Sequence, residues 1–310
     1  MTSENVWHAP VMADEVLEYL APSGDGFYMD GTLGGGGHSV RILETCERCR
    51  VLGVDRDAEA IDRARDVLAP HRSRVRFLQE RFDRAPMDPE VRDRGLDGAL
   101  LDLGVSSHQL DQDRRGFTFR AGAPLDMRMT GDAGTDARTF LATAAEEELA
   151  RVFRDYGELK RSRRLASEVV KRRATEPLRT SDDLVAALAV SLGRAPSAKE
   201  KARIFQAVRI AVNEELEALD AGLPAIRDVM KAGGVIVVIA YHSLEDRTVK
   251  NAFREWSRAC VCPPELPACV CRGEPLGETL TRKVIKPSAS EVERNPRARS
   301  ARLRAWRRAA

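Results

Sequence analysis

The sequence lacks any long apolar run. Its longest purely apolar stretch is VIVVIAY, residues 235–241, whereas a membrane-spanning helix needs about 20 such residues. The first residues, MTSENVWHAPVMADEV, contain neither the basic nor the apolar segment of a secretory signal. We therefore expect a soluble, cytoplasmic protein with no membrane partner.

The sequence also lacks a strong excess of one charge. With 50 basic and 48 acidic residues in 310, the net charge of +2 indicates no particular partner. The distribution is more informative, because seven Lys or Arg residues lie in 160–173 and seven arginines lie in 294–308. Two local basic stretches favour contact with a polyanion, although a solvated helix face and a basic tail are the alternative.

Cysteines number only six, and in a cytoplasmic protein we expect reduced thiols or metal ligands rather than disulfides. Cys46 and Cys49 form a C-x₂-C pair without a matching second pair, for which free thiols are the simpler expectation. The other four form two C-x-C pairs in the segment CVCPPELPACVC: Cys260, Cys262, Cys269 and Cys271. This group offers four ligands for a tetrahedral structural zinc site, against which a loop of reduced thiols is the other interpretation.

Strand-like and helix-like segments alternate in the first and last thirds of the chain. The predicted strands are 26–30, 50–55, 74–79, 97–105 and 233–241, with two more at 280–287 and 300–307. Strands that alternate with helices are typical of a parallel sheet covered on both faces. The fold class predicted is therefore a Rossmann-like α/β domain.

The middle of the chain has a different pattern. Residues 111–135 are rich in turn-forming residues, and helices without a strand candidate follow up to residue 200. A long helix is then predicted over 198–219, after which the α/β pattern resumes. The simplest organisation is one α/β domain, residues 1–110 and 201–310, interrupted by an all-helical insertion at 111–200.

A glycine-rich segment, YMDGTLGGGGHS at 28–39, follows the first predicted strand. Glycines here allow a ligand to approach the backbone closely. A phosphate-binding P-loop is excluded because no lysine follows the last glycine. The dinucleotide pattern G-x-G-x-x-G is incomplete, because Ser39 occupies the third glycine position.

Asp30 distinguishes between the remaining ligands. A carboxylate at the end of the first strand repels a pyrophosphate but attracts the ammonium and sulfonium of S-adenosylmethionine. Asp55, at the end of the second strand, suits the hydroxyls of a ribose. The order Asp30, glycine loop, Asp55 favours a methyl donor, whereas a capping role in a tight turn is the alternative for Asp30.

Several longer motifs resemble one family. They include DGTLGGGGHS, GVDRD, LLDLGVSSHQLD, PLDMRM, FQAVRIAVNEELEAL, YHSLEDRTVK and NPRARSARLR, and they extend nearly from end to end. With these motifs in this order, the chain resembles the bacterial small-subunit ribosomal RNA cytosine-N4 methyltransferases, the RsmH or MraW family. The resemblance implies a class I methyltransferase sheet, S-adenosylmethionine as cofactor, and a cytidine N4 amine of 16S rRNA in the small ribosomal subunit as substrate.

The resemblance also implies contacts with the methyl donor at Gly36, Gly37, His38, Asp55, Phe82, Asp102 and Gln109. Phe82 is expected to pack on the adenine, with a place in the ordinary core as the alternative. Asp102 is expected first as a donor contact and then as the catalytic acceptor of a hydrogen bond from the amine. Helix initiation by His38 and turn capping by Gln109 are the alternatives to ligand contact.

His242, Ser243 and Glu245 follow the fifth predicted strand and are expected to bind substrate, with capping of the next helix as the alternative. Two neighbours depart from the family pattern. His108 stands where the family usually has proline, and Tyr241 stands where it usually has phenylalanine.

RNA contact is expected from the helical insertion and the two basic stretches. The target base has to be flipped into the pocket before it can be methylated. Two other functions remain open from the sequence. One is a methyltransferase with the same donor pocket that acts on DNA or protein, and the other is a non-catalytic RNA-binding ribosome assembly factor.

Overall fold

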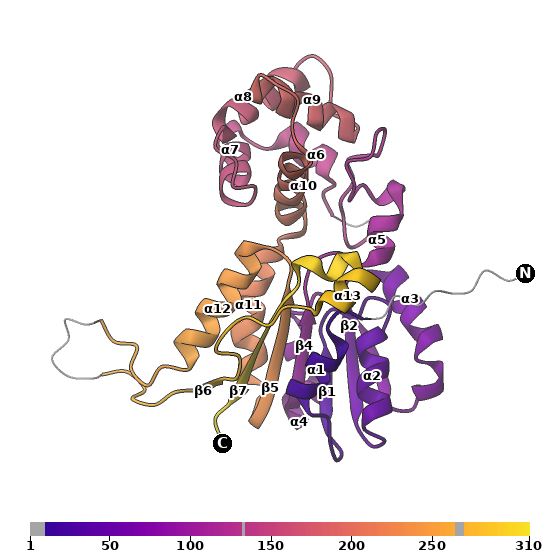
Figure 1. The fold of residues 1–310 in the computed structure, drawn as a ribbon, viewed down its shortest axis with the longest axis vertical. Helices are drawn as coiled ribbons and strands as arrows, with labels where there is room; N and C mark the ends of the chain where they lie inside the picture. The colour runs from indigo at the N-terminus through magenta and orange to yellow at the C-terminus, as the bar shows by residue number, and fades with distance from the viewer. Residues whose placement is uncertain (1–9, 132–133, 264–269) are drawn as a thin grey trace, which may run out of the picture. The chain divides into compact units, whose positions relative to one another are not determined.

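The computed structural model describes residues 10–131, 134–263 and 270–310. The chain divides into two compact units (Figure 1). The first, which we call the sheet unit, consists of Met1–Gly104 and Glu217–Ala310, and the second, the helical unit, is Val105–Leu216. The helical unit is longer than the insertion expected at 111–200, because helix α10, Ala198–Asn213, belongs to it.

The predicted helix over 198–219 is interrupted. Helix α10 ends before Glu214, whose left-handed backbone (φ 51°) separates it from α11, Glu215–Asp228. This φ is costly for a residue with a side chain and stops the hydrogen-bonded ladder of a helix. The apolar pattern continues across the break, which is why the sequence predicted one helix instead of two.

A seven-stranded sheet forms the centre of the sheet unit, in the order β3-β2-β1-β4-β5-β7-β6. Its strands are β1 Phe27–Asp30, β2 Arg50–Asp55, β3 Val75–Gln79, β4 Leu96–Asp102, β5 Met230–Ala240, β6 Gly277–Thr279 and β7 Arg302–Arg308. Strands β1 to β5 are parallel, and β7 is antiparallel to β5 and β6. The order 3-2-1-4-5 is that of doubly wound nucleotide-binding sheets, so the Rossmann-like fold class is confirmed.

The prediction of a strand over 280–287 is wrong. Strand β6 lies earlier, at Gly277–Thr279, and beyond it only Ile285 forms an isolated bridge, to Leu303. The backbone N–H of Ala305 donates a hydrogen bond to Thr281 Oγ1 at 3.1 Å. In a regular pair of strands a backbone carbonyl would accept this bond, so regular strand pairing stops at Thr281.

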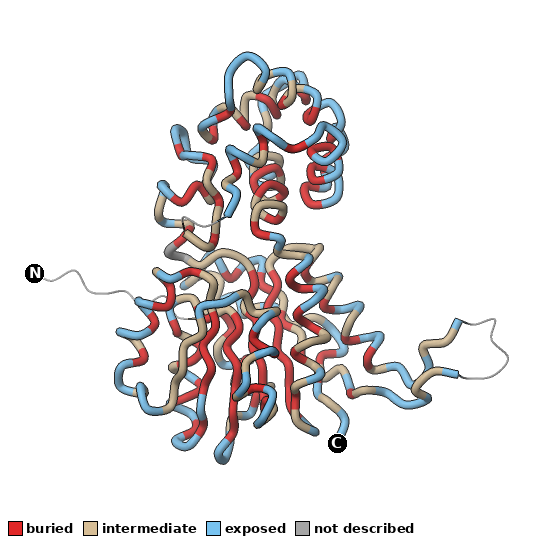
Figure 2. The backbone as a smooth tube through the Cα atoms, turned by 180° about the vertical axis from the view of Figure 1, so that it is seen from behind, coloured by how far each residue is buried: buried red, intermediate tan, exposed pale blue. Residues whose placement is uncertain are grey.

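Helices cover both faces of this sheet, as its largely buried central strands require (Figure 2). Along β4, Leu100 belongs to one apolar core and Leu101 to the other. The first core is closed by α1 Ala13–Leu20, α2 Gly37–Thr45 and α3 Ala58–Val67, and the second by α4 Pro89–Arg94, α11 and α12 Ser243–Trp256. A short helix, α13 Ala289–Arg294, precedes β7. Among the helices of the described residues, none has the length and apolar character needed to cross a membrane.

The helical unit contains α5 Ser107–Asp111, α6 Ala137–Thr143, α7 Glu146–Asp155, α8 Ser162–Arg173, α9 Ser181–Leu192 and α10. The turn-rich loop before α6 is anchored by the buried amide of Asn213. Its Oδ1 accepts from Met129 N at 2.8 Å, and its Nδ2 donates to Met127 O at 2.7 Å. Since buried backbone groups need partners, this side chain holds the loop on α10, together with Arg115, whose guanidinium donates to Arg128 O and Met129 O.

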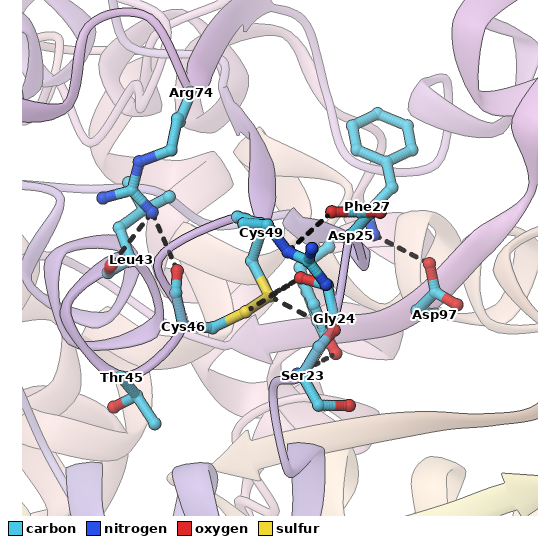
Figure 3. The surroundings of a disulfide bond; sticks show 12 residues. Ser23, Gly24, Asp25, Phe27, Leu43, Thr45, Cys46, Cys49, Arg74 and Asp97 are labelled. Atoms are coloured by element: carbon cyan, nitrogen blue, oxygen red, sulfur yellow. Dashed lines mark hydrogen bonds and ion pairs between the residues drawn. A yellow bond between two sulfur atoms is a disulfide. The ribbon is translucent and has the colours of Figure 1, made fainter.

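Cys46 and Cys49 form a disulfide, contrary to the expectation of free thiols (Figure 3). Helix α2 ends at Thr45 and β2 begins at Arg50, so the intervening turn brings the two Cα atoms to 5.4 Å. This separation lies within the range that a disulfide spans. The expectation failed because it rested on the usual redox state of a compartment, whereas the pairing follows from local turn geometry.

Candidate functional site

Three aspartates end three adjacent strands of the sheet. Asp30 ends β1, Asp55 ends β2 and Asp102 ends β4, and β1 lies between the other two. Parallel strands place their carboxyl ends at one edge, and the order reverses between β1 and β4. In doubly wound sheets, ligands bind outside this edge at the point of reversal. The three carboxylates therefore mark the candidate site.

The glycine loop joins β1 to α2 at the same edge. Gly34 and Gly36 have φ values of 52° and 81°, which residues with side chains rarely adopt. A Cβ atom at Gly35 would meet nothing within 4 Å, whereas one at Gly36 would approach Leu68 and one at Gly37 would approach Pro10. The open side of the loop is therefore at Gly35, beside the predicted ligand contacts.

Asp55 is held against this loop by backbone donors. Its Oδ2 accepts from Gly34 N at 2.8 Å, and its Oδ1 accepts from Asp57 N at 2.9 Å. Burial raises the pKa of Asp55 from its usual range to about 6, against the lowering effect of these two hydrogen bonds. Each carboxylate oxygen can accept more than one hydrogen bond, so Asp55 keeps capacity for ligand hydroxyls.

Asp30 and His38 leave buried polar atoms unsatisfied. Asp30 is 1% exposed, and its Oδ2 accepts from Ser39 Oγ at 2.7 Å. Its Oδ1 and both ring nitrogens of His38 have no hydrogen-bond partner among the described residues. Burial raises the pKa of Asp30, and nearby His38 opposes this shift. Because an unpartnered buried polar atom costs about 1–3 kcal/mol, such a group calls for an explanation, and a polar ligand supplies one.

Asp102 has one constrained oxygen and one freer oxygen. Tyr241 Oη donates to its Oδ1 at 2.8 Å, and its Oδ2 lies 3.6 Å from His38 Nε2. Thr32 Oγ1 accepts from the Asp102 backbone N–H at 2.6 Å. Burial, followed by the Asp102 charge, raises the pKa of Tyr241 well above its usual range, so the phenol stays a donor. The side chain of Asp102 is thus oriented, with Oδ2 toward His38.

The contact between Tyr241 and Asp102 was not predicted from the sequence. Tyr241 stood out only as a departure from the family pattern, because the two positions are 139 residues apart in the chain. The pair forms because β4 and β5 are adjacent, with Asp102 beside Ile239 in the register. Only knowledge of that strand pairing could have revealed it.

Phe82 lies near this edge, and its side chain also packs against the second apolar core. A Cβ atom at Gly222 of α11 would fall 2.6 Å from its ring, so α11 covers one side of the ring. The ring is only partly buried, and packing on an adenine stays a prediction.

Gln109 belongs to the helical unit and is buried. Its Oε1 accepts from Ser106 N at 3.0 Å, while its own N–H donates to Ser106 Oγ at 3.2 Å. This reciprocal pair caps the start of α5, as the alternative interpretation expected. Donor contact by Gln109 stays a prediction. The side chain of His108 lies outside the described part of the structure.

His242, Ser243 and Glu245 lie at the start of α12. His242 is the N-cap residue, and Ser243 is the first residue of the helix. Glu245 Oε2 accepts from Tyr241 N at 2.8 Å and from His242 N at 3.2 Å, and the Glu245 residue is 2% exposed. Glu245 therefore takes part in a capping box that fixes the turn after β5. Substrate binding by these three residues stays a prediction.

The basic stretch in the helical unit has two kinds of member. Arg161 and Arg173 donate to backbone carbonyls at the ends of α9 and α6, and Arg172 pairs with Glu168 at 2.6 Å. These three stabilise helices. The other members, Lys160, Arg163, Arg164 and Lys171, are exposed. The surface available to a polyanion is therefore smaller than the sequence indicated.

The part of the C-terminal basic stretch on β7 links elements of the sheet unit. Arg304 pairs with Asp246 of α12 at 2.6 Å, Arg307 pairs with Glu278, and Arg308 donates to the carbonyl of Arg227. These three arginines therefore have an internal structural role. The arginines before β7 are exposed: Arg294, Arg297 and Arg299.

In the cysteine-rich segment, the sulfurs of Cys260, Cys262 and Cys271 lie within 4.8 Å of one another. Cys269 lies outside the described residues. The structure therefore brings together three of the four predicted zinc ligands.

The sheet order, the glycine loop and the acids at the carboxyl edge define a class of protein. That class is the Rossmann-like methyltransferases, in which a glycine-rich turn after β1 and acids after successive strands face the ligand. The chain belongs to the MraW methylase family, whose model matches residues 5–309.

Individual relatives are similar over their whole length. A ribosomal RNA small subunit methyltransferase H from Gemmatimonas aurantiaca is 50% identical over 303 residues, covering 97% of this chain and 95% of the relative. One of the same name from Syntrophotalea carbinolica is 48% identical, covering 99% and 100%. A solved rRNA methylase from Streptococcus thermophilus, with 8% identity, covers 96% of this chain and 95% of its own at a TM-score of 0.43, which is too low to add to the assignment.

Proposed function

We propose that this protein uses S-adenosylmethionine to methylate the N4 amine of a cytidine in 16S rRNA of the small ribosomal subunit. The observation that carries the proposal is the set of unsatisfied polar atoms of Asp30 and His38 beside Asp102, in a chain of the MraW methylase family. The names of its relatives support a small-subunit rRNA target. An enzyme with this substrate acts in the cytoplasm of a bacterium.

The donor pocket is proposed at the carboxyl edge, where the residues fit this cofactor. When bound, S-adenosylmethionine supplies an electrophilic methyl group on a cationic sulfur. Asp55 accepts hydrogen bonds from the ribose hydroxyls, which its fixed orientation against Gly34 favours. The negative charge of Asp30 favours the cationic part of the donor. Its free Oδ1 and the ring of His38 provide the polar atoms that a ligand would satisfy.

Asp102 is proposed as the catalytic residue. The lone pair of a cytosine amine is delocalised into the ring, so the amine is a weak nucleophile. A carboxylate that accepts a hydrogen bond from this amine localises the lone pair and orients the nitrogen. Since Tyr241 occupies Oδ1, the oxygen suited to this acceptor role is Oδ2, and His242 with Ser243 and Glu245 is proposed to contact the base.

The helical unit is proposed to hold the RNA. The exposed side chains on and beside α8 that suit phosphate contacts are Lys160, Arg163, Arg164 and Lys171, and such contacts give affinity with little sequence information. The target cytidine is expected to leave its stack before it reaches Asp102. Selection of one cytidine therefore depends on the shape of the RNA as well as on the pocket.

Mass spectrometry of 16S rRNA tests the substrate directly. Cells that lack the protein are expected to lose one N4-methylcytidine, and the wild-type gene is expected to restore it. If every N4-methylcytidine persists, the proposed substrate is wrong. Calorimetry with S-adenosylmethionine tests the donor separately, and absence of binding would instead support a non-catalytic RNA-binding assembly factor. Methylation of DNA or protein by the purified enzyme, with 16S rRNA unmodified, would support a different acceptor.

A further inference from the structure

Two arms of chain connect α12 to β6 and extend away from the sheet (Figure 1). Cys260 and Cys262 lie on the first arm, and Cys271 lies on the second. None of these three described cysteines forms a disulfide, and each is partly or fully exposed. They have no place in the proposed methyl transfer, so their convergence needs its own explanation.

The spacing of two of the sulfurs matches a tetrahedral metal site, and the third lies close to both. Zinc bound by thiolates has Zn–S distances of about 2.3 Å, so two sulfurs on one tetrahedron are separated by about 3.8 Å. The sulfurs of Cys260 and Cys271 are 3.9 Å apart, and all three sulfurs lie within 4.8 Å of one another. A disulfide needs about 2.05 Å between sulfurs, so the arrangement is that of ligands around a common point rather than a bonded pair.

Backbone N–H groups point at two of the sulfurs. Val261 N donates to Cys271 Sγ at 3.3 Å, and Val270 N donates to Cys262 Sγ at 3.4 Å. Each bond crosses from one arm to the other. Hydrogen bonds to a sulfur stabilise it as a thiolate, which is the form that binds a metal. These backbone contacts are a second observation that favours a ligand set.

The two arms are held in register before the cysteines begin. Arg272 donates to Glu255 Oε1 at 3.1 Å, to Glu255 O at 2.6 Å and to Arg258 O at 3.1 Å. This one guanidinium joins the second arm to the end of α12 and fixes the base of the connection. A metal would therefore bind arms that are already in position, with a smaller entropic cost of closing the loop.

We propose that Cys260, Cys262 and Cys271 form a thiolate site for Zn²⁺ that cross-links the two arms between α12 and β6. Thiolates are soft ligands, and three of them close together select Zn²⁺ over Mg²⁺ or Ca²⁺. The metal displaces the thiol protons, so its binding weakens at low pH. The site is structural, since it lies outside the carboxyl edge of the sheet where the methyl donor is proposed to bind.

Metal analysis of the full-length protein tests the proposal. Protein purified without chelators and dialysed against metal-free buffer is expected to retain about one zinc per chain, with an apparent Kd below roughly 0.1 μM in chelator competition. The double variant Cys262→Ser/Cys271→Ser is expected to lose this zinc. The matched control Cys46→Ser/Cys49→Ser removes two cysteines elsewhere and is expected to keep it.

A second measurement avoids dependence on the folding of the variants. In wild-type protein, added Zn²⁺ is expected to protect Cys260, Cys262 and Cys271 from alkylation, as read by peptide mass spectrometry. Zinc content equally low in wild type and double variant, or alkylation rates unchanged by Zn²⁺, would overturn the proposal. Because neither readout measures methyl transfer, its failure is distinct from failure of the proposed function.

Discussion

The two edges of the central sheet carry similar side chains but use them differently. Strand β4 has an aspartate near each end, Asp97 at the amino edge and Asp102 at the carboxyl edge. Asp97 Oδ2 accepts from Phe27 N and from Lys231 Nζ, both at 2.7 Å. Asp102, in contrast, has only Oδ1 in a hydrogen bond that orients it, and its Oδ2 lies beside the unsatisfied ring of His38.

The contrast extends beyond this one strand. At the amino edge, Arg74 donates to the carbonyls of Leu43 and Cys46 at the end of α2 (Figure 3). At the carboxyl edge, buried Asp30 keeps an oxygen without a partner among the described residues. The number of acids therefore does not locate the site. The site is located instead by hydrogen-bonding atoms that the fold leaves without partners. The two edges are therefore expected to respond to mutation in opposite ways.

The largest effect is expected at the carboxyl edge, from Asp102→Ala. Loss of the carboxylate removes the proposed acceptor for the amine proton, and methyl transfer to small-subunit RNA is expected to fall roughly 10²–10⁴-fold. The free energy of unfolding is expected to fall by only about 1 kcal/mol, the cost of leaving the Tyr241 hydroxyl without its acceptor, because Tyr241 is the one donor to the Asp102 side chain among the hydrogen bonds described. Wild-type activity in this variant would remove Asp102 from the site.

The matched change at the amino edge, Asp97→Ala, is expected to give the reverse result. It leaves Phe27 N without its acceptor and Lys231 without its ion pair, and the free energy of unfolding is expected to fall by about 1.5–3 kcal/mol. Urea denaturation measures this loss. Calorimetry is expected to show an unchanged Kd for the methyl donor, and a large loss of donor affinity would contradict the separation of the two edges.

These two aspartates also show what sequence reasoning can and cannot give. The strand pattern located β4, and the position of Asp102 after the apolar run placed it at the carboxyl edge. Asp30 and Asp55 followed from the same reasoning, because strand ends are visible in the pattern of apolar residues. The fold class was predictable for this reason, since it depends on the order and type of elements.

The partners of these residues were not predictable. Tyr241 meets Asp102 through strand pairing, and Asp97 meets Lys231 across 134 residues of sequence. Local patterns contain no information on such contacts. The wrong strand at 280–287 and the missed helix break at Glu214 have a related cause, because each depends on a local backbone conformation that an apolar pattern does not encode.

A smaller effect is expected from the disulfide between Cys46 and Cys49, near the amino edge. The closed loop is short, so the chain-entropy model gives at most about 2 kcal/mol of stabilisation. Reduction, or the Cys46→Ser/Cys49→Ser variant, is expected to lower the midpoint of urea denaturation accordingly. Donor affinity is expected to stay unchanged, and a loss of affinity on reduction would show that the edges are coupled.

The smallest effect is the pH dependence of donor binding through Asp55. Burial raises its pKa to about 6 in the folded protein, above the value in the unfolded chain. Its protonated form therefore favours folding, and this contribution is lost as pH rises through about 6. Donor binding responds in the opposite sense, because the proposed contact with ribose hydroxyls uses the carboxylate. As pH falls from about 7 to about 5, the ionised fraction and the donor affinity are expected to fall about tenfold.

Calorimetry across this pH range measures the effect, and Asp55→Asn provides the control. An amide oxygen still accepts hydrogen bonds but does not titrate, so the variant is expected to bind more weakly at pH 7 and to lose the pH dependence assigned to Asp55. A dependence that persists in full in Asp55→Asn would assign it to another group, with Asp30, whose pKa is also raised by burial, the first to examine. In either case, the titrating group would lie at the carboxyl edge, where burial without full pairing leaves carboxylates able to respond to a ligand.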